Sequence, residues 1–331
     1  MDKNLIEANS LVKEYKVKNT EDGNVFTRLF KGAGKQTVEA LKGVTFSVSE
    51  GEFVGLVGNN GAGKSTLVKL MTGILYPGGG TLRVLGRDPF LNREQNSREL
   101  GVVFGQRSQL KWDLSPMDSF RLLKMIYQID SARFVQNVAL FEELFDMGGF
   151  IGHPVRTLSL GQRMRCEIAA AFLHNPRVVF LDEPTIGLDV FSKEAIANFL
   201  HVMREKEKVT VILTTHDLEE MGKICDRAII LDRGEILLEE KIDTLLKGYN
   251  QNRKVVFSTK NEKVQFDWEE EGITVTKESY RLTVDNVANN RLTALIAYVV
   301  SANDVVDMEI LEASFTDVIK ALLKEGGRAA C

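Results

Sequence analysis

The chain has 331 residues, more than one hydrophobic core usually carries, which predicts a large domain and a smaller one. With 44% hydrophobic and 27% charged residues, the composition is that of a folded globular protein and excludes wholesale disorder. The formal net charge of -4 provides no basic footprint, so we expect no nucleic-acid partner.

Cysteine usage and apolar runs bear on the compartment. The 3 cysteines are far apart and form no C-x-x-C pair, which argues against a disulfide framework or a zinc site and fits a reducing cytoplasm. The N-terminus leads into no apolar signal segment, and the apolar runs are too short to span a bilayer. Any membrane role is therefore expected to come from another chain.

Near the N-terminus, the stretch from Leu11 to Val48 alternates in a way that predicts antiparallel strands. A polar and basic insert from about Lys16 to Glu39 interrupts it. Its four apolar residues can share one helical face, namely Val25, Phe26, Leu29 and Phe30. A short helix packed on its own domain is the favoured interpretation, and a face that touches a membrane surface or a partner is the alternative.

From about Glu52 to Leu231, short apolar runs alternate with helical patterns, which is typical of a parallel sheet covered on both faces. The predicted strands are 53–57, 102–104, 178–181 and 209–213. Each ends at a polar cluster, and ligands of open parallel sheets gather at those carboxyl ends. The sequence therefore predicts an α/β fold with a binding site along one edge of the sheet.

A phosphate-binding loop follows the first of these strands. The pattern G-x-x-x-x-G-K-S is fulfilled by Gly58, Asn59, Asn60, Gly61, Ala62, Gly63, Lys64 and Ser65, with Thr66 next. It opens a helix predicted to place Leu67, Leu70, Met71 and Ile74 on one face. Loop N–H groups and the helix dipole hold phosphate, Lys64 reaches the β and γ phosphates, and Ser65 binds Mg²⁺. The loop predicts an ATP site.

Between residues 107 and 157 the strand signal gives way to helical patterns, which predicts an inserted helical lobe. Its expected buried positions are Leu122, Leu123, Ile126, Leu140, Leu144 and Phe145. The lobe is followed by Ser159, Leu160, Gly161 and Gln162, and a helix from about Arg163 to Leu173. This second helix N-terminus with small residues predicts a second anion site, far from the chain's own phosphate loop, whose phosphate comes from another subunit.

Asp182 and Glu183 end the third predicted strand and place two carboxylates side by side. Taken alone, the pair fits a plain strand-end turn equally well. Beside a phosphate loop, Asp182 suits the Mg²⁺ shell and Glu183 suits a general base that deprotonates the attacking water. Gln106 and His216 follow two further strands on the same edge, where Gln106 can sense the γ phosphate or a Mg²⁺ water and His216 can bond the γ phosphate.

The polar joint from Gly248 to Asn252 separates residues 1–247, the expected ATPase domain, from a small α+β unit at 253–331. The predicted strands of this unit are 255–258, 273–277, 282–285 and 305–311, and its predicted helices are 291–300 and 314–324. No catalytic cluster appears in it.

In this order, the motifs resemble the nucleotide-binding subunit of ATP-binding cassette (ABC) transporters, over about Leu5 to Leu238. The resemblance implies Walker A at Gly58–Thr66, Walker B at Asp182 and Glu183, and the signature at Ser159–Gln162. It also implies that Gln106 is the Q-loop glutamine, that His216 is the switch histidine, that Asp189 ends the D-loop, and that Tyr15 stacks on adenine. One departure is Leu160, which stands where the signature usually has a second glycine.

The resemblance further implies a function. Two cassettes, as a homodimer or a heterodimer, would sandwich two ATP molecules with Mg²⁺ head to tail, and hydrolysis would drive separate transmembrane permease subunits at the inner face of the cell membrane. The wording of Leu158 to Val190 looks like the bacterial branch that exports drugs, lipids or polysaccharides. In that branch, accessory domains like the C-terminal unit aid dimer contact or regulation.

Two other functions compete with this one. A soluble cassette ATPase acting on ribosomes or DNA would carry two cassettes joined by a basic linker, or long coiled-coil insertions, and this sequence shows neither. A phosphoryl-transferring kinase with the same loop would leave the helix that follows Ser159 without a role. The sequence favours the transporter ATPase.

Overall fold

The computed structural model describes residues 4–18, 35–105, 108–215, 218–245, 252–268 and 273–312. Gln106, His216, the predicted helical face within the insert and the predicted helix 314–324 lie outside these ranges. The chain divides into two compact units, residues 1–216 with 220–239, and residues 240–331 with the short stretch 217–219. Each unit is described by itself.

A three-stranded antiparallel sheet begins the first unit. Its strands β1 (Asn4–Lys18), β2 (Lys35–Ser49) and β4 (Gly79–Val84) are ordered β2-β1-β4. The alternating pattern predicted the first two, but the expected insert from about Lys16 to Glu39 was too long, because residues 16–18 belong to β1 and residues 35–39 to β2. It missed β4, in which only Leu82 and Val84 are buried.

A six-stranded sheet forms the centre of this unit, in the order β5-β6-β7-β3-β8-β9. The strands are β3 (Phe53–Val57), β5 (Leu100–Phe104), β6 (Val178–Asp182), β7 (Thr210–Thr215), β8 (Arg227–Asp232) and β9 (Glu235–Lys241). The first five named here pair in parallel. The register pairs Phe104 with Asp182, Asp182 with Thr214, and Val57 with Thr215. The ends of four strands thus lie at one edge of the sheet, as predicted.

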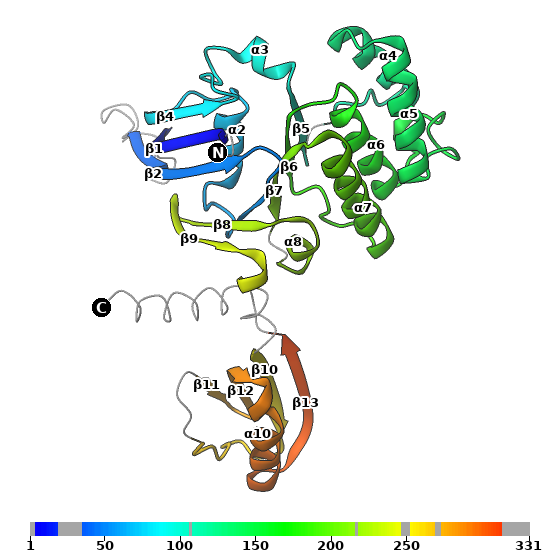
Figure 1. Cartoon of the computed structure of the whole chain (residues 1–331). Helices are drawn as coiled ribbons and strands as arrows, with labels where there is room; N and C mark the ends of the chain where they lie inside the picture. Colours follow the sequence, from blue (N-terminus) through cyan, green and yellow to red (C-terminus); the bar gives the residue numbers. More distant parts are fainter. Residues whose placement is uncertain are drawn as a thin grey trace, which may run out of the picture. The chain divides into compact units, whose positions relative to one another are not determined.

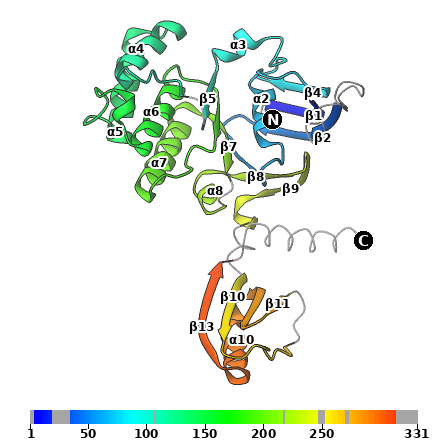
Figure 2. The same cartoon turned by 180° about the vertical axis from the view of Figure 1, so that it is seen from behind.

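Helices cover the sheet and build the lobe. They are α2 (Lys64–Met71), α3 (Arg93–Ser97), α4 (Pro116–Tyr127), α5 (Ser131–Phe145), η1 (Val155–Thr157), α6 (Leu160–Phe172), α7 (Val190–Glu207) and α8 (Leu218–Ile224). Figures 1 and 2 show α4, α5 and α6 beside α7, on the side of the sheet where β5 and β6 lie, and the three-stranded sheet on the other side.

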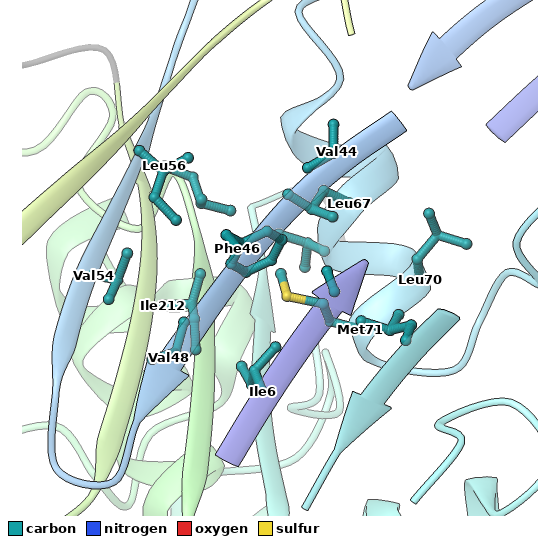
Figure 3. Close-up of a cluster of buried hydrophobic side chains, with 14 of the residues drawn as sticks. Ile6, Val44, Phe46, Val48, Val54, Leu56, Leu67, Leu70, Met71 and Ile212 are labelled. Atoms are coloured by element: carbon teal, nitrogen blue, oxygen red, sulfur yellow. The ribbon is translucent and has the colours of Figure 1, made fainter. Parts of the chain in front are cut away.

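One core joins the two sheets of this unit. Phe46 from β2, Leu67 and Met71 from α2, and Leu56 from β3 are among its buried members. Figure 3 shows these side chains gathered in the space between the strands and α2. The loop that precedes α2 begins at the end of β3, so this buried strand and the packed helix fix both of its ends. Ile74 is not part of the predicted helical face, since α2 ends at Met71 and Ile74 is 40% exposed.

The lobe packs on α7 through stacked and edge-on phenylalanine rings, which belong to Phe141, Phe145, Phe172 and Phe199. Of the predicted core positions in the lobe, Leu123 and Phe145 are buried, and Leu122, Leu140 and Leu144 are partly buried. The prediction for Ile126 is wrong, because this side chain is 63% exposed on the outer face of α4.

The second unit is a four-stranded sheet with one described helix. Strands β10 (Asn252–Thr259), β11 (Thr274–Glu278), β12 (Arg281–Ala288) and β13 (Val305–Glu312) are ordered β11-β12-β10-β13, and α10 (Asn289–Ala302) follows β12. Phe257, Val284, Leu295 and Val299 belong to its core. Across the described residues of both units, every helix is too short or too polar to cross a bilayer.

Candidate functional site

The phosphate loop runs from the end of β3 into the first turn of α2. Gly63 caps α2 with φ 109°, in the left-handed region, and accepts the N–H of Leu67 at 2.9 Å. A Cβ at Gly63 would lie 2.7 Å from the carbonyl oxygen of Ala40, so glycine is required on two counts. The loop can therefore wind tightly enough to direct backbone N–H groups at a phosphate.

Lys64 is the buried cation of this loop, with 6% of its surface exposed. Its ammonium donates to the carbonyl oxygens of Gly58 at 2.5 Å and Asn59 at 3.3 Å. Burial lowers the pKa of Lys64, while the carboxylates of Glu183 and Asp182 act to raise it. A partly desolvated ammonium beside exposed loop amides fits the phosphates of a nucleotide, since an anion stabilises its charged form.

The carboxylates at the end of β6 are held by Thr214 of the neighbouring strand. The Thr214 hydroxyl donates to Asp182 Oδ1 at 2.6 Å, and its oxygen accepts the backbone N–H of Glu183 at 2.9 Å. Glu183 has φ 52°, an uncommon left-handed conformation for a residue other than glycine. Such a conformation costs on the order of 1–3 kcal/mol and is typical of functional sites. Sequence reasoning missed the role of Thr214, because its contact with Asp182 depends on the register in which β7 pairs with β6.

A pocket of about 870 Å³ brings the loop and the carboxylates together. It is lined by residues 59–66 of the loop, by Phe104 and Gly105 at the end of β5, and by Asp182 and Glu183. Ser65 and Asp182, two of the predicted Mg²⁺ ligands, face the same space. Among the described residues, no group of three or more acidic, histidine or cysteine side chains could hold a metal ion. Of the predicted magnesium ligands, the structure thus describes this hydroxyl and this carboxylate, and Gln106 lies outside the described residues.

Three further residues were predicted to act at this pocket, namely Tyr15, Gln106 and His216. The Tyr15 hydroxyl is 3.4 Å from Thr66 Oγ1, so this ring sits beside the last residue of the loop. Gln106 and His216 belong to the undescribed residues. Their neighbours are Gly105, which follows β5 and lines the pocket, and Thr215, which ends β7. The predicted roles of Gln106 and His216 stay predictions.

The residues from Ser159 to Gln162 form a helix start that does not line this pocket. Ser159 caps α6 and accepts the N–H of Gln162 at 3.2 Å, while the Gln162 side chain accepts the N–H of Ser159 at 2.9 Å. This reciprocal pair is a capping box. Of the residues that line the described pocket, none comes from this segment.

A second helix start packs against the first. Asp189 caps α7 and accepts the backbone N–H and the hydroxyl of Ser192, both at 2.9 Å, which lower the pKa of Asp189. A Cβ on Gly161 would lie 2.4 Å from Ser192 Oγ, so the absence of a side chain permits this contact. Asp189 and Gly161, predicted to act at different motifs, are thereby brought together.

Leu160 occupies the first position of α6 without disturbing its cap. Its side chain is 43% exposed. A Cβ placed on Gly187 would be 3.4 Å from Leu160 Cδ2, so the leucine lies toward the turn that precedes α7. The helix still begins with a complete capping box, so leucine in place of the usual glycine leaves the local backbone regular.

A parallel sheet whose glycine loop, buried lysine and strand-end carboxylates line one pocket defines a P-loop nucleoside triphosphatase. Comparisons narrow this class. The pattern of the family described as "ABC transporter" matches residues 41–186. YdbJ of Bacillus subtilis, an uncharacterised ABC transporter ATP-binding protein, is 30% identical over 70% of this chain and 72% of its own length.

PotA of Spiroplasma citri, a spermidine/putrescine import ATP-binding protein, is 32% identical, and the match covers 76% of this chain and 65% of PotA. The solved dimer of the ATP-binding cassette MJ0796 with ADP and Pi is 26% identical and covers 72% of this chain and 98% of its own, with a TM-score of 0.60. The protein belongs to the ATP-binding proteins of ABC transporters. It is an ATPase of this family.

Proposed function

We propose that this ATP-binding subunit works as one of two cassettes and drives export through separate permease subunits. The observation that carries the proposal is the separation of two anion sites within one chain. The loop, Asp182 and Glu183 share a pocket, whereas Ser159 and Gln162 start a helix that does not line it. Each pocket then needs a signature segment from another cassette, as a homodimer or a heterodimer supplies it.

Within one pocket, the chain's own residues have distinct roles. Loop N–H groups and the Lys64 ammonium bind and orient the phosphates, and Tyr15 contacts the adenine. Bound Mg²⁺ would neutralise phosphate charge, and Ser65, Asp182 and Gln106 would hold it directly or through water. Glu183 orients the attacking water and accepts its proton, a role typically worth ~10² to 10⁴ in rate. His216 bonds the γ phosphate.

The second cassette completes the site with its own signature. The N–H groups in the first turn of α6 and the Ser159 hydroxyl would bond the γ phosphate bound by the partner chain. Asp189 and Gly161 hold α6 and α7 together at the same surface. The dimeric state of the similar cassette MJ0796 supports this arrangement.

Glu183→Gln tests the two-cassette arrangement. The amide keeps the shape of the carboxylate but accepts no proton, so the variant should retain ATP binding and lose most turnover. It should then accumulate as an ATP-bound dimer, which size-exclusion chromatography with MgATP detects. The matched preparation is the same variant without nucleotide, which should elute as a monomer. An eluate that stays monomeric with MgATP would contradict the arrangement.

The direction of transport is the finer part of the proposal. The wording of the segment 158–190 supports export, while PotA, a relative of similar identity, is named as an import protein. Purification of the chain with its permease from native membranes would identify the partner. In proteoliposomes with the cassettes outside, external ATP should then drive substrate into the lumen. Loss of substrate from the lumen would indicate import.

We also propose a location and an accessory domain. Bound to its permease, the subunit would sit on the cytoplasmic face of the cell membrane. Residues 253–331 would form an accessory domain that aids dimer contact or regulation, beside an ATPase domain of residues 1–247. The compact core around Phe257 and Val284 supports an independent unit.

A further inference from the structure

Glu167 is a buried carboxylate on the signature helix that the roles above leave unused. It lies on α6 two helical turns beyond Ser159, and only 5% of its surface is exposed. Burial raises the pKa of Glu167, and hydrogen bonds from Ser108 and Gln109 counteract this increase. Burial of a carboxylate costs desolvation free energy, whereas an apolar side chain would fill the same space without this cost. The hydrogen bonds of Glu167 therefore suggest a role beyond packing.

The donors to Glu167 come from the segment that follows β5. The Ser108 hydroxyl donates to one carboxylate oxygen, and the backbone N–H of Gln109 donates to the other at 3.0 Å. The Gln109 side chain in turn donates to the carbonyl oxygen of Val102 within β5 at 2.5 Å. Glu167 therefore links the signature helix, through two residues, to the strand that leads to the pocket.

The same segment adjoins the nucleotide pocket. Phe104 and Gly105 line it, and only Gln106 and Arg107 separate Gly105 from Ser108. At the other side of Glu167, α6 is a continuous helix from Leu160 to Phe172. A displacement of Ser159 by a second cassette would be transmitted along this helix, because its backbone hydrogen bonds are continuous from Leu160 to Phe172.

We propose that Glu167 is a positioning residue that couples the signature helix to the pocket wall at the end of β5. The arrival of the partner's phosphate at Ser159 then sets the position of Ser108 and Gln109 through the Glu167 bonds, and that of β5 through the bond from Gln109 to Val102. Glu167 contacts no substrate in this account and acts through Ser108 and Gln109. The inference rests on the proposed role of Ser159, which is tested separately by a Ser159→Arg variant, expected to be inactive.

Three variants test the coupling by steady-state ATPase kinetics and by MgATP affinity. Glu167→Ala should lower kcat roughly tenfold or more through misplacement of the pocket wall. It should leave the Kd for MgATP within about twofold of wild type, since no phosphate ligand changes. Glu167→Gln should recover part of the loss, because its amide oxygen still accepts the Gln109 N–H. Ser108→Ala should lower kcat alone but add little to Glu167→Ala, because the two residues share one bond.

Asn137→Ala is the matched control. Asn137 is equally buried in the lobe and joins α5 to the far end of α6, donating to the Leu173 carbonyl at 2.9 Å. It should lower Tm and leave kcat near wild type. Equal kcat losses in Asn137→Ala and Glu167→Ala, or additive losses for Ser108 and Glu167, would overturn the proposal. If Glu167→Ala fails to fold, the kcat losses of Glu167→Gln and Ser108→Ala are compared with that of Asn137→Ala instead. Losses equal to that of the control would overturn the proposal.

Discussion

Thr214 holds Asp182 in place across the boundary between two parallel strands. The Thr214 hydroxyl donates to Asp182 Oδ1 at 2.6 Å, one residue before the end of β7. The same oxygen also accepts the N–H of Glu183 at 2.9 Å. The candidate Mg²⁺ ligand and the candidate general base are thus oriented by a single side chain that contacts neither nucleotide nor metal in the proposed chemistry.

Replacement of this threonine should reduce turnover without removing any proposed ligand. Thr214→Val keeps the shape but leaves Asp182 without its donor, so activity or Mg²⁺ affinity should fall roughly 10–100-fold. Titration of ATPase activity with Mg²⁺ measures both. Thr210→Val at the start of the same strand is the control, since Thr210 bonds Gly51 far from the pocket edge. A Thr214 variant as active as the control would exclude this orienting role.

Mixed subunits should test whether each site is shared between two chains. Ser159→Arg and Lys64→Ala should each be inactive, the first through its signature and the second through its loop. In an equal mixture, half of the dimers pair one variant with the other. Such a dimer has one intact site of two, formed by the loop of the Ser159→Arg chain and the signature of the Lys64→Ala chain. About a quarter of wild-type ATPase activity should therefore return. Mixing each variant with itself gives the baseline. If Ser159→Arg alone keeps wild-type turnover, the signature does not complete another chain's site.

Gly161 should tolerate no side chain while Ser192 is present. The added Cβ of Gly161→Ala would lie 2.4 Å from Ser192 Oγ, so either Ser192 turns away and loses its bond to Asp189, or α6 and α7 shift apart. We expect a loss of about 1–3 kcal/mol in unfolding free energy, which denaturant titration measures. Ser192→Ala removes the clashing oxygen and should restore part of the stability in the double variant. Additive losses would show that the contact is not responsible.

His174 should make stability depend on pH. Its ring stacks on Tyr127 at 3.9 Å between centroids, its Nε2 is 3.0 Å from the Leu100 carbonyl oxygen, and burial lowers its pKa to about 4. Because the unfolded histidine has the higher pKa and binds a proton first, acidification favours the unfolded chain. Between pH 7.5 and 5 this contribution amounts to about 2 kcal/mol.

Denaturant titrations of wild type and His174→Phe at both pH values measure this effect. The phenylalanine keeps the stack on Tyr127 and removes the titrating group. The wild type should lose more unfolding free energy on acidification than the variant does, since other groups titrate equally in both. Identical losses would mean that His174 is free to become protonated in the folded state.

The sequence predicted what local rules determine. The glycine spacing before Lys64 specifies the loop, and Ser159 with Gln162 specifies a capped helix, because each depends on residues a few positions apart. Contacts that depend on strand register or helix packing were not predictable. Thr214 reaches Asp182 only because β7 pairs with β6 in this register, and the period of α4 did not reveal that Ile126 faces outward.

The capping box at the start of α6 has a consequence for binding. Ser159 Oγ accepts a hydrogen bond from Gln162, which fixes its rotamer but leaves the hydroxyl proton available. An incoming phosphate oxygen would meet a donor whose side-chain entropy was lost when the helix folded. Binding would then cost no further side-chain entropy at Ser159 when two cassettes meet. The capped helix that stabilises each separate subunit would thus also shape the surface by which the two subunits recognise each other.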